Sequence, residues 1–240
     1  MKAMVLAAGR GTRLRPLTDA IPKPMIPFAG KPMLEYIVRL LAKYGFDEIV
    51  INLYHLPEII EDYFGDGSAW GVSIHYSLEE DLLGTAGAVR KVAEFFDAPF
   101  LVYYGDNLTN FDLGEFWQAH QREGEIATIG LLPMDDPTTR GIIGLDQQNR
   151  IDRFIEKPKP EEVFDDYLVN CGTYAMQPEL LERIPPGTVC DFSQHIFTDL
   201  LAEGHPLVGH RMRGQLLSTD TPDRYQHACK CVNSGSFILP

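Results

Sequence analysis

Residues 2–16 read K-A-M-V-L-A-A-G-R-G-T-R-L-R-P, and they carry the clearest signal of the chain's architecture. The run that ends at Leu6 is apolar and has the length of a strand, and the loop from Ala7 to Pro16 is rich in glycine and arginine. Open α/β sheets bind ligands in the loops at the carboxyl ends of their parallel strands. The stretch therefore predicts an α/β fold with a ligand-binding loop behind its first strand.

Helix and strand patterns alternate after this loop. Apolar spacing and strand-length runs predict, in turn, a helix over 33–44, a strand over 48–53, a helix over 57–64, a strand over 72–76, a helix over 85–96 and a strand over 100–104. Such alternation is typical of a mainly parallel sheet covered by helices on both faces. We therefore expect a Rossmann-like, three-layer α/β fold.

The pattern changes beyond about residue 125, where fewer helices separate the predicted strands. These strands span 126–132, 142–146, 151–155 and 168–176, and helices are predicted over 192–203 and from Pro222 onward. A region rich in strands favours a small antiparallel portion within a mixed sheet. No linker, low-complexity stretch or internal repeat interrupts the chain, so we expect a single domain over residues 1–240.

The composition argues against several classes of partner. The chain has 34 acidic and 21 basic residues, a formal charge of −13, and nucleic acids and anionic membranes favour the opposite sign. No apolar run has the roughly 18 residues of a membrane span, and the N-terminal run is too short for a secretory signal, so we expect a cytoplasmic protein. The four cysteines lack zinc-site spacing and are predicted to be free thiols.

Cations are nevertheless concentrated in the first loop of this acidic chain. Gly9 and Gly11 let the backbone approach a ligand closely, and the N–H groups beside them can meet phosphate oxygens. Arg13 adds a planar cationic fork, and Lys23 adds a second cation on an arm that the flanking prolines keep extended. The combination predicts a polyphosphate cradle.

Other interpretations of the loop are weaker. A dinucleotide-binding fingerprint needs a third glycine where Leu14 stands, and Asn52 occupies the place of the ribose-binding acid. A Walker loop needs a different spacing of glycine and lysine. A solvated polar turn would explain one arginine, but it leaves the two glycines and the P-K-P motif without a reason.

The segment L-A-A-G-R-G-T-R-L-R-P-L-T at 6–18, followed by P-K-P at 22–24, resembles the signature of the sugar-1-phosphate nucleotidylyltransferases. Further segments that agree with this family are L-G-T-A-G-A at 83–88, Y-G-D-N at 104–107, I-E-K-P at 155–158, V-N-C-G-T-Y at 169–174 and T-P-D-R-Y at 221–225. The resemblance implies transfer of a nucleotidyl group from an NTP to a sugar 1-phosphate, which gives an NDP-sugar and pyrophosphate.

The resemblance also implies roles for individual residues. The reaction is an in-line displacement at the α-phosphorus, so the catalytic residues Arg13, Lys23 and Asp106 would act by positioning and charge stabilisation. Asp106 would hold Mg²⁺ against the phosphates. The nucleotide would be bound by Leu6, Ala8, Gly9, Gly11, Thr12, Arg13, Lys23, Gly84 and Thr85. The sugar phosphate would be bound by Asn107, Gly141, Glu156, Lys157 and Asn170.

Simpler interpretations of four of these residues stay open from the sequence. Thr85 is also a common helix N-cap, and an aspartate after a strand, such as Asp106, is often a turn former. Pairs such as Glu156 and Lys157 are mostly solvated surface charges elsewhere.

The second metal ligand of the family departs from its pattern. Relatives carry D-I-G-T-P, whereas this chain reads L-S-T-D-T-P, with Ser218 at the aspartate and Asp220 at the glycine. Asp220 would reach the metal through a shifted loop, or Ser218 would hold it through water, or the site is weakened. Asp220 is the candidate for the second metal ligand.

The nucleotide is expected from local similarity. L-G-T-A-G and R-F-I-E-K-P are most like segments of mannose-1-phosphate guanylyltransferases, so GTP with mannose 1-phosphate, or a similar hexose or cyclitol phosphate, is the first expectation. A uridylyl- or thymidylyltransferase of the same family is the alternative, and a non-catalytic nucleotide-sensing relative is another, because of Ser218. A glycosyltransferase would need a D-x-D motif, which Asp106-Asn107-Leu108 lacks.

The end of the sequence bears on the expected assembly. Residues 229–240, C-K-C-V-N-S-G-S-F-I-L-P, contain no hexapeptide repeat, so we expect a catalytic domain without a C-terminal β-helix. A homo-oligomer is compatible with the sequence, which does not determine the oligomeric state.

Overall fold

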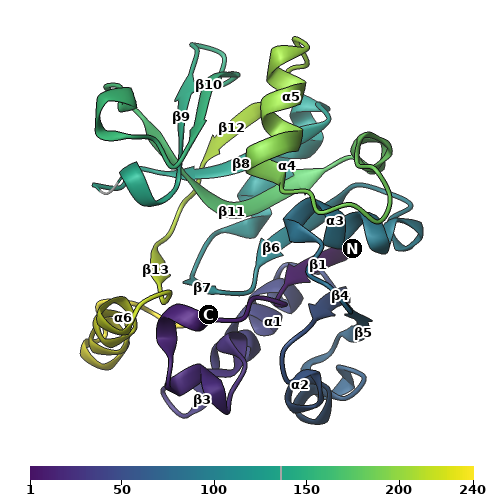
Figure 1. Cartoon of the computed structure of the whole chain (residues 1–240), viewed down its shortest axis with the longest axis vertical. Coiled ribbons are helices and arrows are strands. Elements are labelled where there is room, and N and C mark those ends of the chain that lie inside the picture. Colours follow the sequence, from purple (N-terminus) through teal and green to yellow (C-terminus); the bar gives the residue numbers. More distant parts are fainter. Residues whose placement is uncertain (136) are drawn as a thin grey trace. The chain divides into compact units, whose positions relative to one another are not determined.

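The computed structural model describes residues 1–135 and 137–240, and these residues form two compact units (Figure 1). Unit 1 consists of Met1–Leu82, Tyr103–Leu113 and Arg213–Pro240. Unit 2 consists of Leu83–Val102 and Gly114–Met212. Each unit is therefore built from segments that are distant in the sequence.

Unit 1 contains a parallel sheet in the strand order β1-β4-β5. The strands are β1 (Lys2–Leu6), β4 (Glu48–Leu53) and β5 (Ser73–Leu78), and the crossover helices are α1 (Met33–Lys43) and α2 (Pro57–Phe64). Five of the six residues of β4 are buried, as expected for a strand covered on both faces. The register pairs Leu6 with Asn52, so the first loop and the end of β4 begin at the same edge of the sheet.

Two short antiparallel pairs complete unit 1. One joins β2 (Pro27–Phe28) to β3 (Lys31–Pro32), and the other joins β7 (Asn107–Thr109) to β13 (Leu216–Ser218). In Figure 1 the yellow C-terminal segment runs through β13, beside β7, into α6 (Pro222–Ser234). Helix α6 begins where its sequence favours it, because the Thr221 side chain accepts a hydrogen bond from the N–H of Arg224 and Pro222 takes the first helical position.

Unit 2 contains the antiparallel part of the fold. Its strands are β8 (Ala127–Leu132), β9 (Gly141–Leu145), β10 (Ile151–Glu156), β11 (Leu168–Met176) and β12 (Val208–Arg211). Strand β11 is buried throughout and pairs with β8 and β9, β10 pairs with β9, and all three pairings are antiparallel. Strand β12 lies parallel to β8.

The helices of unit 2 are α3 (Gly84–Lys91), α4 (Leu113–Glu123, which starts at the unit boundary) and α5 (Phe197–Ala202). Strand β6 (Phe100–Tyr104) runs from unit 2 into unit 1. Within the described ranges, every helix is too short or too polar to cross a membrane.

The predicted α/β class, with a mixed sheet that has an antiparallel part, is confirmed. The strands predicted over 48–53, 100–104 and 168–176 and the helix over 57–64 have the predicted bounds. The helix predicted over 192–203 begins with a π-helical turn, Phe192–Ile196, before α5. Helix α4 and strands β7, β12 and β13 were not predicted.

Candidate active site

The first loop of unit 1 is anchored at its start by two buried polar side chains. The N–H of Ala7 donates to Asn52 Oδ1 at 2.7 Å, and Asn52 Nδ2 donates to Glu79 Oε1 at 2.6 Å. Asn52 and Glu79, at or just beyond the ends of β4 and β5, are each 4% exposed. Because a buried hydrogen bond resists rearrangement, these residues fix the place where the chain leaves β1. Sequence analysis assigned neither of them to the site; the signal was a polar residue at the carboxyl end of each neighbouring strand.

The two glycines of the loop differ in what surrounds them. Gly11 has a φ of 62°, and a Cβ there would lie 2.9 Å from Thr18 Cγ2 and 3.1 Å from Lys23 Cβ. A Cβ on Gly9 would meet no described atom within 4 Å. Gly11 therefore shapes the turn that leads into the 3-10 helix Thr12–Leu14, and Gly9 leaves open space beside the backbone. Both were predicted to serve close approach of a ligand, but the structure gives Gly11 a local steric reason.

Lys23 lies in a 3-10 turn, Lys23–Met25, and not on the extended arm that the flanking prolines predicted. The cause of this difference is local. Pro22 is extended, but the N–H of Met25 donates to the carbonyl of Pro22 and the N–H of Ile26 donates to the carbonyl of Lys23. Only 7% of the Lys23 side chain is exposed, and its Nζ donates to Asp106 Oδ2 at 2.7 Å. A buried ammonium needs a counter-charge, and Asp106 supplies it.

Asp106 follows β6, at the strand end where the sequence predicted it. The N–H of Gly105 donates to the carbonyl of Leu6 at 2.9 Å, which ties this turn to the end of β1. Asn107 pairs with Ser218, so the C-terminal segment lies beside the residues that follow Asp106. Thr219 Oγ1 donates to the Asp106 carbonyl at 3.0 Å. The turn that carries Asp106 is thus held by β1 on one side and by the segment after β13 on the other.

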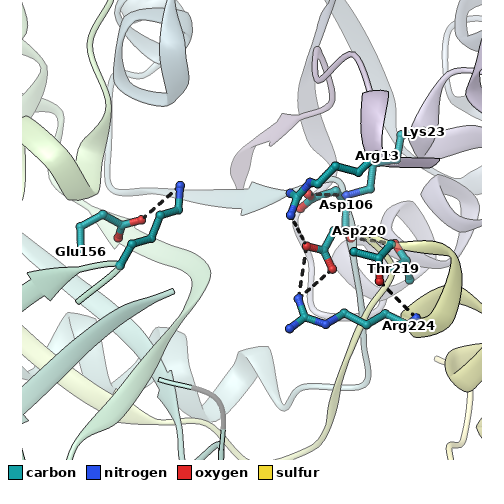
Figure 2. Close-up of polar contacts among 9 residues, drawn as sticks. Arg13, Lys23, Asp106, Glu156, Thr219, Asp220 and Arg224 are labelled. Atoms are coloured by element: carbon teal, nitrogen blue, oxygen red, sulfur yellow. Dashed lines mark hydrogen bonds and ion pairs between the residues drawn. The ribbon is translucent and has the colours of Figure 1, made fainter. Parts of the chain in front are cut away.

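Asp220 completes this cluster, and Figure 2 shows it between two guanidinium groups. Arg13 Nη1 donates to Asp220 Oδ2 at 2.7 Å, and Arg224 Nη1 lies 3.0 Å from Oδ1 and 3.3 Å from Oδ2. Burial alone would raise the pKa of the Asp220 carboxyl, but the hydrogen bond and charge of Arg224 and the charges of Arg13 and Lys23 lower it. The structure therefore brings four predicted residues together in unit 1: Arg13, Lys23, Asp106 and Asp220.

The donor set fits a magnesium ion that is completed by substrate. Among residues 1–135 and 137–240, no group of three or more His, Cys, Asp or Glu side chains could hold a metal. Mg²⁺ in phosphoryl-transfer sites is held by one or two carboxylates, with substrate phosphates and water as the other ligands. The Asp106 side chain is 41% exposed and can supply such a carboxylate, whereas both oxygens of Asp220 accept guanidinium N–H groups.

Three of the predicted sugar-phosphate residues lie in a row across adjacent strands of unit 2. The register pairs Glu156 of β10 with Gly141 of β9. On the other side of β9, the antiparallel register with β11 pairs Leu168 with Ile143 and Val169 with Ile142. One step further along both strands are Asn170 on β11 and Gly141 on β9. A Cβ on Gly141 would lie 2.8 Å from Glu156 Oε2, which explains a glycine at the centre of the row.

The groups in this row have distinct environments. Burial raises the pKa of the Glu156 carboxyl, although the charge of Lys157 and a hydrogen bond from Ser193 act against it. The exposed Lys157 has a positive φ of 48°, and its Nζ lies 4.0 Å from Glu156 Oε1. Asn170 is buried and donates to Tyr174 Oη at 2.9 Å. The fifth predicted sugar-phosphate residue, Asn107, is buried in β7 of unit 1.

The turn at Gly84 and Thr85 in unit 2 is closed by a distant segment of the same unit. The N–H and the Oγ1 of Thr85 both donate to Asp191 Oδ1, each at 3.0 Å, and Thr85 Oγ1 accepts from the N–H of Phe192 at 3.0 Å. A Cβ on Gly84 would lie 2.6 Å from the carbonyl oxygen of Cys190. Asp191 thus caps the start of α3, a role that sequence analysis missed; nucleotide binding by Gly84 and Thr85 stays a prediction.

Comparison with known proteins now adds to this geometry. The model of a family described as nucleotidyl transferase matches residues 2–223. The chain belongs to the nucleotidyl transferase family. The predicted resemblance to sugar-1-phosphate nucleotidylyltransferases is thereby confirmed at the level of the family.

The relatives of this nucleotidyl transferase are named for different nucleotides and sugars. It is 41% identical, over 98% of its length, to a UTP–glucose-1-phosphate uridylyltransferase of Synechocystis sp., of which it covers 64%. It is 35% identical, over 84% of its length, to a mannose-1-phosphate guanylyltransferase of Mycobacterium tuberculosis, of which it covers 56%. The chain thus spans about half to two thirds of the length of these curated relatives.

Solved structures agree with the fold of this nucleotidyl transferase. A Bacillus anthracis protein assigned as a glucose-1-phosphate thymidylyltransferase, solved with sucrose, superposes with a TM-score of 0.86 at 25% identity, over 97% of this chain and 95% of that one. A UDP-glucose pyrophosphorylase solved with UDP-glucose gives a TM-score of 0.84 at 20% identity, over 98% of each chain, and so supports the fold alone.

Proposed function

We propose that this nucleotidyl transferase moves a nucleotidyl group from an NTP to a sugar 1-phosphate and releases pyrophosphate. The observation that carries the proposal is the cluster of Arg13, Lys23, Asp106 and Asp220 behind β1, in a chain with a formal charge of −13. Cations gathered at the end of a parallel strand in an acidic protein suit a polyphosphate. Both curated relatives described above are named for this class of reaction.

In this proposal the loop binds the triphosphate through Arg13 and Lys23. An ammonium has three N–H donors and a guanidinium has five, so each cation can keep its carboxylate partner and still donate to a phosphate oxygen. Lys23 is 7% exposed and held by Asp106, so its position is set before substrate arrives. Preorganised donors of this kind stabilise charge that develops in the transition state.

Asp106 would hold Mg²⁺ together with the substrate phosphates. The ion, when bound, neutralises phosphate charge and helps to align the attacking and leaving oxygens. The backbone at Gly9 would face the nucleotide, because the space beside it is open.

The sugar 1-phosphate is assigned to the row in unit 2. Glu156 would accept hydrogen bonds from sugar hydroxyls and Asn170 would add its amide, while Lys157 would meet the phosphate. The register that aligns Glu156, Gly141 and the residue beside Asn170 supports this assignment.

GTP with mannose 1-phosphate, or a similar hexose or cyclitol phosphate, is the first proposed pair. It is supported by the L-G-T-A-G and R-F-I-E-K-P segments and by the guanylyltransferase relative. UTP with glucose 1-phosphate is the second, favoured by 41% identity over 98% of the chain. One missing hydrogen bond to a base costs on the order of 1–3 kcal/mol, so a single contact can change the preference.

The test is a panel of four NTPs, Mg²⁺ and several sugar 1-phosphates, read by pyrophosphate release. We expect release with at least one pair, and none from the same pair with Asp106→Asn or without Mg²⁺. Nucleotide binding by calorimetry with no release from any pair would instead support a non-catalytic nucleotide-sensing protein.

A further inference from the structure

We propose that Asp220 is a positioning residue that, together with Arg224, sets the guanidinium of Arg13 for the triphosphate, and that it does not ligate the metal. The inference rests on the proposed function and deepens it. It concerns a residue that stands where the family resemblance predicts a glycine, and it replaces the metal role expected for Asp220 from the sequence.

Asp220 is itself held in place from both sides. The preceding residue, Thr219, is 1% exposed, and its Oγ1 donates to the carbonyl of Asp106. The following residue, Thr221, caps α6. Arg224 lies on the first turn of α6, four residues beyond Asp220. Its Nη1 donates to both oxygens of the Asp220 carboxylate. The carboxylate is therefore fixed by a buried anchor, a helix start and a cation.

Arg13 has no comparable anchor of its own. Its side chain is 67% exposed, and it extends from a three-residue 3-10 turn. A long exposed side chain samples many rotamers, and an exposed ion pair usually limits them little. The carboxylate that holds Arg13 is only 15% exposed and carries a second guanidinium, so this pair is better shielded than an ordinary surface pair. Arg13 uses Nη1 for Asp220, which leaves its other N–H donors for phosphate.

The same contacts argue against a metal at Asp220. Both carboxylate oxygens accept guanidinium N–H groups, and the positive charge of Lys23 also acts on this carboxyl. A divalent cation bound there would have to displace two arginines, whereas one bound at Asp106 would not.

The experiment is a double-mutant cycle of Asp220→Ala and Arg13→Ala, with NTP binding by calorimetry and kcat and KM for the accepted NTP. We expect D220A to weaken NTP binding about tenfold and R13A to weaken it more. In the R13A background, D220A should have less than about a twofold effect, because contacting residues that act through one another are not additive. R224A should show a smaller loss with the same dependence on Arg13.

A metal readout separates the two roles of Asp220. With NTP saturating for each variant, we expect the Mg²⁺ concentration for half-maximal activity, and the binding of Mn²⁺ measured by electron paramagnetic resonance, to be unchanged in D220A and weakened in D106N. Weakened Mn²⁺ binding in D220A, or an equal loss of NTP binding by D220A with and without Arg13, would overturn the inference.

Controls keep these outcomes distinguishable. Asp19→Ala removes a matched aspartate–arginine pair, with Arg15, from the same region and should leave NTP binding unchanged. D220N retains the size of the side chain and replaces D220A if the latter does not fold. A wild-type chain that binds no NTP overturns the proposed function and the inference together, whereas wild-type binding that D220A does not alter overturns the inference alone.

Discussion

The loop behind β1 in unit 1 and the turn at Gly84 in unit 2 were both predicted to bind nucleotide, yet they are built differently. In the loop, the cations Arg13 and Lys23 are paired with carboxylates and the space beside Gly9 is open. In the turn, the donors of Thr85 are taken by Asp191, and Gly84 lies against the Cys190 carbonyl. A glycine in a binding motif can therefore either leave room for a ligand or allow a tight turn. The atoms that surround it distinguish the two cases.

Removing the buried cation of the loop should have the largest effect. Lys23→Ala should lower kcat about 10²–10³-fold, as observed when one preorganised transition-state donor is lost. The change also removes the Lys23 ammonium from Asp106, so D106N, which removes the charge on the other side of the pair, provides the matched comparison for that effect. A K23A protein that folds and keeps wild-type kcat would remove the loop from the chemistry.

The next effect concerns the turn in unit 2. Asp191→Ala removes the acceptor of two hydrogen bonds from Thr85 and should lower the free energy of unfolding by about 2 kcal/mol, since the lost acceptor is charged. Denaturant unfolding monitored by circular dichroism measures it. Asp146→Ala, which removes an acceptor of two backbone N–H groups from an exposed turn, is the control and should cost about 1 kcal/mol or less. Equal losses of unfolding free energy in the two variants would mean that Asp191 stabilises its turn no more than Asp146 stabilises the exposed one.

The smallest effect compares the two glycines of the loop. Gly11→Ala should lower the free energy of unfolding by about 1–2 kcal/mol, because its φ is 62° and its Cβ would crowd Thr18. Gly9→Ala should leave stability unchanged and raise KM for the NTP, because the added methyl would occupy the open space. Denaturation curves and steady-state kinetics on both variants decide it, and the reverse pattern would contradict the assignment.

Much of the scaffold could be predicted because its strands are long and apolar. The run E-I-V-I-N-L gave the bounds of β4, whereas β7 and β13 have three residues each and exist because Asn107–Thr109 pairs with Leu216–Ser218. Helix α4 was missed although Leu113, Phe116 and Trp117 are buried at helical spacing, because its sequence L-G-E-F-W-Q-A-H-Q-R-E contains a glycine in the first turn and, apart from Ala119, is polar after Trp117.

The site shows the same division. Cations near glycines stand out in a sequence, so Arg13 and Lys23 were found. The residues that hold the site in place are remote in the sequence. Asp220, which contacts Arg13, is 207 residues from it, and Asp191, which contacts Thr85, is 106 residues from it. Local patterns carry no information on such contacts, and Lys23 was expected on an extended arm because prolines alone do not reveal a 3-10 turn.

The return of residues 213–240 to unit 1 has a consequence for biosynthesis. The loop that carries Arg13 is synthesised well before its partners, because Asp220 follows it by 207 residues and Arg224 comes later still. A nascent chain can form the early β-α-β segment, yet Arg13 lacks the Asp220 carboxylate until 207 further residues have been made. The loop therefore acquires its final electrostatic form long after its own residues have been synthesised.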